Sequence, residues 1–106
     1  MPILLTEGLH DQATPSVTTE ALAAAARVPI VGDPSTSPEA LTLRGLAPIP
    51  LPTSGNVLGW DAAFITAGLG QFPDQDHYAI YQDKAARRLY RDFLVTALDG
   101  DAALEE

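Results

Sequence analysis

The sequence contains no cysteine, and its first 59 residues contain no aromatic residue. Without cysteine there are no disulfides, thiolate nucleophiles or cysteine metal ligands, and either redox compartment remains compatible. Basic residues are also few, because 6 Lys and Arg stand against 14 Asp and Glu, for a formal charge of −8. This charge argues against binding to nucleic acid or to an anionic membrane, since affinity for phosphate depends on positive charge.

Long apolar runs are absent as well. A membrane span needs roughly 18 apolar residues, and the best candidate, residues 57–70, is interrupted by Asp61. Residues 1–5 lack a basic region and are soon followed by Glu7, so we expect no secretory signal. We therefore expect a soluble protein of the cytoplasm or of a virion, in which 106 residues form one domain with a modest core.

The strongest positive signal is a helical periodicity over residues 74–98. Asp74 is placed to cap the helix, Asp76 lies in its first turn, and Gly100 follows its end. A basic strip occupies one side of this helix and consists of Lys84, Arg87, Arg88 and Arg91. The apolar and aromatic side chains of one broad arc predict that the opposite side is buried. They are Tyr78, Tyr81, Ala85, Ala86, Leu89, Tyr90, Phe93, Leu94 and Ala97.

A second helix is predicted over residues 57–67. This segment is apolar nearly all round, which favours burial against the long helix, and Gly68 and Gly70 follow as terminators. A short connection then predicts an antiparallel helical hairpin formed by residues 57–67 and 75–98. The predicted fold class is accordingly mainly α.

The composition changes sharply near Gly55. All aromatic residues lie from Trp60 to Phe93, whereas eight of the nine prolines precede position 53. Aromatic side chains dominate core energetics, so we predict an extended Pro-rich arm over 1–55, a helical core over 56–98 and an acidic tail over 99–106. The arm is expected to carry a short strand at 2–6, one short helix from Thr18 or Thr19 to about Arg27, extended residues 30–31, and a second short helix opened by Ser37 as N-cap and Pro38.

The arm contains a possible repeat at an offset of 19 residues. Residues 15–22 followed by Pro29-Ile30 resemble residues 34–41 followed by Pro48-Ile49. Each copy predicts a short helix and then an extended Pro-Ile segment. Biased composition also imitates repeats, so a chance resemblance remains the alternative.

Two groups of residues were weighed as chemical sites. Asp74, Asp76 and His77 could ligate a divalent ion or transfer a proton, but helix starts select Asp for capping alone. Glu7, His10 and Asp11 form a second acid–imidazole group, and no GxSxG motif accompanies either group. We therefore predict no catalytic residue, no cofactor and no metal.

Two segments are predicted to bind other proteins. One is the basic strip, because Arg side chains suit bidentate contacts with carboxylates; the alternative is an ordinary solvated face. The other consists of Pro48, Ile49, Pro50 and Leu51, where alternating proline favours a polyproline II path with carbonyls open to a partner.

The predicted function is a non-enzymatic structural or accessory subunit that binds other subunits of a larger assembly. We expected a small virion protein that decorates or joins capsid or tail subunits as the first setting. A non-catalytic or regulatory subunit of a multi-subunit enzyme is the alternative. A small metal-binding enzyme domain using Asp74, Asp76 and His77 ranks third.

Overall fold

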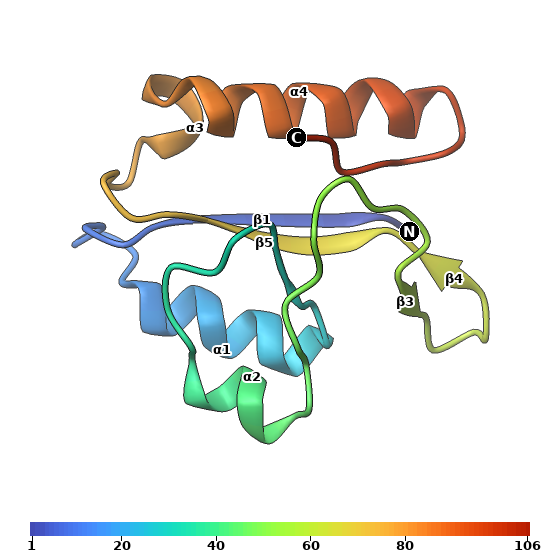
Figure 1. Cartoon of the computed structure of the whole chain (residues 1–106), viewed down its shortest axis with the longest axis horizontal. Helices are drawn as coiled ribbons and strands as arrows, with labels where there is room; N and C mark the ends of the chain where they lie inside the picture. Colours follow the sequence, from blue (N-terminus) through green and yellow to red (C-terminus); the bar gives the residue numbers. More distant parts are fainter.

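The computed structural model describes all 106 residues and has three layers, with one sheet between two layers of helices (Figure 1). The central sheet is parallel with strand order β1-β5-β2, and a separate antiparallel hairpin pairs β3 with β4. α1 and α2 lie on one face of the sheet, and α4 lies on the other. The elements are β1 (Ile3–Gly8), α1 (Ser16–Ala26), β2 (Ile30–Val31), α2 (Glu39–Leu43), β3 (Val57–Leu58), β4 (Phe64–Ile65), β5 (Ala67–Phe72), α3 (Ala79–Gln82) and α4 (Lys84–Leu98).

The last strand in sequence, β5, lies in the middle of the sheet. Ile3 pairs with Ala67 at one end of β1, Gly8 pairs with Phe72 at the other, and Ile30 on the opposite side pairs with Leu69. Strands that are buried on both faces are typically continuous apolar runs, which fits residues 67–70. Each half of the chain therefore contributes strands to one sheet.

Two glycines allow the α4 face of β5 to pack closely. A Cβ on Gly68 would lie 2.6 Å from both Leu104 Cδ1 and Val31 Cγ1, and one on Gly70 would lie 2.9 Å from Leu89 Cδ2. Glycine in a strand often marks such a close approach. Gly68 and Gly70, which were predicted to end a helix, thus lie within β5, where α4 and the C-terminal segment pack on them.

Two apolar clusters form the core, one on each face of the sheet. The first joins Ala23, Ala24 and Val28 to Leu41 and Leu69 beneath α1 and α2. The second lies beneath α4 and consists of Val31, Leu89, Phe93 and Leu104. Aliphatic side chains from the first half of the chain therefore supply much of the core.

The helical hairpin is wrong, and the fold is mixed α/β. Residues 57–67 form β3, β4 and the start of β5, with Trp60 fully exposed in the turn. The long helix is shorter than predicted, because Asp83 rather than Asp74 caps α4: Asp83 Oδ1 accepts a hydrogen bond from the Ala86 amide at 2.9 Å. Residues 74–78 form a loop instead.

The extended arm is also wrong. Its predicted elements exist, but β1 and β2 pair with β5, and α1 and α2 cover the sheet. Pro15 and Pro38 occupy the N-cap positions, and neither helix has a side-chain cap, so Thr18, Thr19 and Ser37 do not have the predicted role. The acidic tail is anchored by Leu104, which is fully buried and whose backbone pairs with Thr53.

The virion setting does not stand either, because it depended on an arm lying over neighbouring subunits and on the helical hairpin. The chain is instead a compact α/β unit in which residues 1–55 are part of the sheet and its helices. None of its helices combines the length and the apolar character that crossing a lipid bilayer requires.

The two copies of the possible repeat have the same order of elements but different extents, because α1 has 11 residues and α2 has 5. In the first, α1 is followed by Pro29-Ile30, and Ile30 joins the sheet as part of β2. In the second, α2 is followed by Pro48-Ile49, and Ile49 forms a parallel bridge with Val31. Each copy is therefore a helix followed by a segment added to the same sheet.

Candidate functional site

Three loops converge at the carboxyl end of the parallel sheet. They follow β1, β2 and β5 and comprise residues 9–15, 32–38 and 73–78. Open α/β sheets bind ligands at this end, because the strands point their carboxyl ends towards the same crevice. Asp11 and His77, two of the residues considered from the sequence as chemical sites, lie in these loops.

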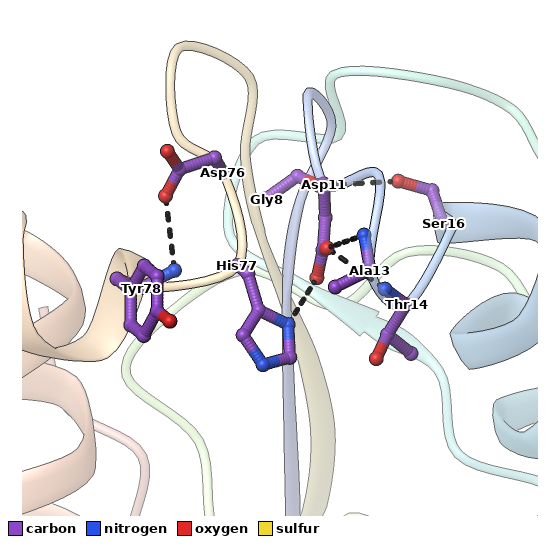
Figure 2. Close-up of polar contacts among 8 residues, drawn as sticks. All are labelled: Gly8, Asp11, Ala13, Thr14, Ser16, Asp76, His77 and Tyr78. Atoms are coloured by element: carbon purple, nitrogen blue, oxygen red, sulfur yellow. Dashed lines mark hydrogen bonds and ion pairs between the residues drawn. The ribbon is translucent and has the colours of Figure 1, made fainter.

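Asp11 and His77 join two of these loops (Figure 2). Asp11 Oδ1 accepts hydrogen bonds from the Ala13 and Thr14 amides at 2.9 and 2.8 Å, which fixes the carboxylate, and Asp11 Oδ2 lies 3.0 Å from His77 Nδ1. Burial alone would raise the pKa of Asp11, but the hydrogen bonds from Thr14, His77 and Ala13 outweigh it and lower that pKa. An ionised Asp11 requires a proton on Nδ1, which leaves Nε2 of a neutral ring as an acceptor.

The other parts of a catalytic arrangement do not surround this pair. The Ser16 hydroxyl donates to the Gly8 carbonyl at 3.3 Å and not to His77 (Figure 2). No group of three His, Cys, Asp or Glu side chains in the chain could hold a metal ion. What the geometry does establish is a connection between the loop after β1 and the loop after β5.

The acidic groups predicted beside His77 and His10 are separated in the fold. Asp76 Oδ1 accepts from the Tyr78 amide at 3.0 Å, so it stabilises a turn (Figure 2). His10 is exposed, and its amide donates to the Gln75 carbonyl at 3.0 Å. Glu7 points into the protein instead of joining His10 and Asp11. A turn contact thus accounts for Asp76, and the predicted role at the start of the long helix is wrong, because that helix begins after Asp83. The Asp11–His77 pair was not predicted.

Glu7 is the buried end of a polar network that the sequence did not predict and that runs to the surface at Ser35 and Thr36. The residue is 4 % exposed, and its Oε1 accepts from Gln71 Nε2 at 2.8 Å. Gln71 Oε1 in turn accepts from the Ser35 amide at 2.8 Å, and Gln71 Nε2 also donates to Thr36 Oγ1 at 2.8 Å. The network connects β1, β5 and the loop after β2 at the carboxyl end of the sheet.

The second oxygen of Glu7 has no hydrogen-bond partner. Burial raises the pKa of Glu7 from its ordinary value of 4.5 to about 7, and the carboxylate of Glu20 on α1 raises it further against the lowering effect of Gln71. An ionised carboxylate at this position costs free energy because it loses hydration and faces a second acid. Glu7 therefore holds its proton at a pH where ordinary glutamates have lost theirs.

The predicted basic strip lies on the outside of α4. Lys84, Arg87, Arg88 and Arg91 are exposed and, with Tyr90, line a shallow depression of about 420 Å³. Asp83 does not pair with Arg87, because it caps the helix, and Asp92 pairs with Arg91 instead of Arg88, with Arg91 Nη2 lying 3.0 Å from Asp92 Oδ1. Most of the strip's charge is directed to solvent.

The Pro48–Leu51 segment is largely occupied within the chain itself. The Ile49 amide donates to the Ile30 carbonyl at 2.8 Å, and the Ile49 carbonyl accepts from the Gly32 amide at 2.9 Å. Leu51 packs against the cluster beneath α4. An outside partner would therefore find Pro48 and Pro50 exposed, whereas the Ile49 backbone is already bonded.

A different exposed surface lies at the amino end of the sheet, and we call it the hairpin surface. It comprises Leu58, Trp60 and Phe64 of the β3–β4 hairpin, which are 59 %, 100 % and 71 % exposed. Leu58 and Phe64 are paired residues on the two strands. A cleft of about 440 Å³ adjoins this surface between the hairpin and the end of α4, and its lining includes Met1, Phe64, Ala97 and Asp101.

Comparison of the chain with protein-family models, with curated proteins and with solved structures found no match.

Proposed function

We propose that this protein is a non-catalytic accessory subunit, which binds another protein of a larger assembly through the hairpin surface. The observation that carries the proposal is the full exposure of Trp60 between two other exposed apolar side chains, Leu58 and Phe64. Tryptophan is among the residues that contribute most binding energy at protein interfaces, where its large ring fills a pocket on the partner. The other two strand residues of the hairpin, Val57 and Ile65, pack against the core cluster beneath α1, whereas these three side chains remain available to a partner.

The surroundings of the hairpin surface indicate the chemistry of the partner. Asp61 lies in the hairpin turn, Asp101 lines the adjoining cleft, and the basic residues of α4 begin at the other end of that helix. An apolar centre with an acidic rim complements an apolar pocket with a basic rim. The partner we propose therefore presents an indole-sized apolar pocket bordered by Lys or Arg.

The basic strip is proposed as a second contact for an acidic region of the same assembly. Its exposed charges would mainly affect the association rate and the salt dependence, because solvated ion pairs contribute little affinity. The strip is therefore expected to matter less than Trp60. The loss of partner affinity on changing each surface therefore shows which of the two contributes more.

The test uses the only tryptophan in the chain as its own reporter. Proteins from the native source that bind the immobilised wild-type chain are purified and titrated against it. The tryptophan emission of the complex is recorded, and the emission of the partner alone is subtracted. Burial of Trp60 predicts a shift of the emission to shorter wavelength. The Trp60→Ala, Phe64→Ser double variant should lose at least tenfold in affinity.

A matched comparison is the triple variant Arg87→Gln, Arg88→Gln, Arg91→Gln. We expect it to retain most of the affinity at high salt and to lose a few-fold at low salt, because screening already removes that contribution. Equal affinity of wild type and the Trp60, Phe64 double variant, with unshifted emission, would overturn the proposed role of the hairpin surface.

A further inference from the structure

The two edges of the central sheet differ in whether they can accept another strand. On one side, Ile49 is bonded to β2, and both of its neighbours are proline. Because proline has no N–H, Pro48 and Pro50 cannot donate to a further strand. Natural sheets often use proline in this way to block pairing at an edge.

The opposite edge, formed by β1, has no such block. Residues 3–8 read Ile-Leu-Leu-Thr-Glu-Gly and contain no proline and no Lys or Arg. The strand pairs with β5 alone, and residues 3–6 are partly exposed. A strand edge without proline or a basic side chain is a template for pairing with another chain.

The hydrogen bonds to β5 establish which backbone groups remain open. The Ile3 amide donates to the Thr66 carbonyl at 2.9 Å, and the Leu9 amide donates to the Phe72 carbonyl at 3.2 Å. Since successive residues of a strand direct their backbone groups to opposite sides, Ile3, Leu5 and Glu7 bond to β5. The N–H and C=O groups of Leu4 and Thr6 point away from the sheet.

The open part of the edge is limited at both ends. Pro2 precedes it and has no N–H to donate. At the other end, the Gly8 carbonyl already accepts from the Asp11 amide at 3.0 Å and from Ser16 Oγ at 3.3 Å. A partner strand therefore finds its complete set of donors and acceptors at Leu4 and Thr6.

We propose that a second copy of this chain binds this edge, with the two β1 strands antiparallel and related by a twofold axis at Leu5. In this register Leu4 of each copy faces Thr6 of the other, and both open residues of both copies make a doubly bonded pair. A register centred on Leu4 would place Thr6 opposite Pro2, and one centred on Thr6 would place Leu4 opposite the occupied Gly8 carbonyl. The register centred on Leu5 is the one that satisfies all of the open groups.

The side chains agree with this register. The two copies of Leu5 lie opposite each other, and Glu7 faces Ile3 of the other copy, so that no like charges are directly paired. Leu5 and Ile3 border the cluster beneath α1, and Leu4 borders the cluster beneath α4. The joined sheet would therefore extend both apolar clusters from one copy to the next.

The absence of cysteine makes a direct test possible, because one introduced cysteine is the only thiol. Opposed residues at a non-hydrogen-bonded antiparallel position have Cα atoms about 4.5 Å apart, and disulfides span about 4.4–6.8 Å. Leu5→Cys should therefore form an intermolecular disulfide at mild oxidation and run at twice the mass on a non-reducing gel. Ile3→Cys is the matched control, because it faces Glu7 of the other copy and should stay uncrosslinked.

A second variant tests the backbone. Thr6→Pro removes an outward N–H and leaves the bonds to β5 in place, so adding it to Leu5→Cys should reduce crosslinking at least tenfold while the circular dichroism spectrum stays the same. In the wild-type protein, the Leu4 and Thr6 amides should exchange slowly with solvent at high concentration and quickly on dilution. The Leu5 and Glu7 amides should stay protected throughout.

The proposal is overturned if Leu5→Cys and Ile3→Cys crosslink equally, or if the wild-type Leu4 and Thr6 amides exchange quickly at every concentration. Fast exchange that slows only when a different protein is added would mean that the edge accepts another chain and not a second copy. The result is independent of the hairpin surface, because Leu5→Cys should crosslink equally with Trp60→Ala present.

Discussion

The two ends of the sheet are built differently. At the carboxyl end, polar side chains from distant parts of the sequence bond to one another: Glu7 to Gln71 and Asp11 to His77. At the amino end, the side chains of Asn56 and Thr66 bond to backbone groups only, and the hairpin leaves Trp60 and Phe64 exposed. The contrast teaches that the end where α/β proteins usually bind ligands is here occupied by the protein's own contacts, and that a large exposed apolar surface lies at the opposite end.

The largest effect is expected from separating the loops at the carboxyl end. A Cβ on Gly8 would collide with the Asp76 carbonyl oxygen and would lie 2.5 Å from the Gln75 carbonyl oxygen, both of them backbone atoms. Gly8→Ala should therefore lower the free energy of unfolding by about 3 kcal/mol, at the upper end for overpacking. Urea unfolding measures the change, and a loss below about 0.5 kcal/mol would show that the loops separate without cost.

The next largest effect is the pH dependence of stability that the buried Glu7 causes at the carboxyl end of the sheet. The pKa of Glu7 is raised from 4.5 to about 7, so the folded protein binds a proton that the unfolded chain releases. This glutamate therefore lowers stability progressively as pH rises from 4.5 to 7, and its effect is constant above that range and absent below it.

Glu7→Gln removes this titration and keeps the shape of the side chain. We expect the variant to match wild type near pH 4 and to be more stable by about 1–3 kcal/mol at pH 8. Glu39→Gln, on an exposed residue of α2, is the matched control and should change little at either pH. Equal stability of wild type and Glu7→Gln at pH 8 would contradict the raised pKa.

A smaller effect is expected from the Asp11–His77 connection. Because hydrogen bonds lower the pKa of Asp11 below 3.8, its contribution to stability is present above pH 3.8 and is lost as the pH falls through the lowered value. Asp11→Ala should speed amide exchange at Ala13 and Thr14, because Asp11 Oδ1 accepts hydrogen bonds from both amides. His77→Ala should leave those two amides protected. Exchange that is unaffected by Asp11→Ala would mean that other contacts hold this loop.

The smallest effect on stability is expected at the hairpin surface. Trp60→Ala removes a fully exposed side chain, so thermal unfolding should change by no more than about 0.5 kcal/mol. A large loss of stability would show that the indole packs on the protein and would remove the contrast between the two ends. An unchanged stability with reduced partner affinity would strengthen that contrast.

Local signals in the sequence predicted part of the fold. The helix predicted from Thr18 or Thr19 to about Arg27 and the extended residues 30–31 are present as α1 and β2, with limits shifted by a few residues. Of the helix predicted over residues 75–98, only the part from Lys84 to Leu98 forms the long helix α4. These elements could be predicted because their apolar spacing and end signals are local. The start of α4 after Asp83 was missed because several acidic residues before it were equally able to cap a helix.

The sheet could not be predicted from the same signals. Residues 57–69 are apolar on all sides, and periodicity cannot tell a buried strand from a buried helix in such a run. Two tertiary contacts favour a strand at residues 67–72. β5 pairs with both β1 and β2, and Val31 and Leu104 pack so closely on Gly68 that a side chain there would collide with them. Both are contacts between residues far apart in the chain.

The candidate sites followed the same division. The exposed face of α4 was predicted from helical spacing, and its basic residues are indeed at the surface, although their role as a binding strip stays a prediction. The Asp11–His77 and Glu7–Gln71 contacts join residues 66 and 64 positions apart, so no local motif marks them. The exposure of Trp60 was missed because aromatic residues are usually assigned to the core.

The position of β5 also determines when this protein can fold during synthesis. β1 and β2 are made first, but they share no ladder, because the strand that joins them begins at Ala67. A growing chain therefore holds two unpaired apolar strands until β5, which ends at Phe72, has left the ribosome, and such strands are prone to aggregation. Chaperones that bind nascent chains would encounter this one in that interval, before its sheet exists.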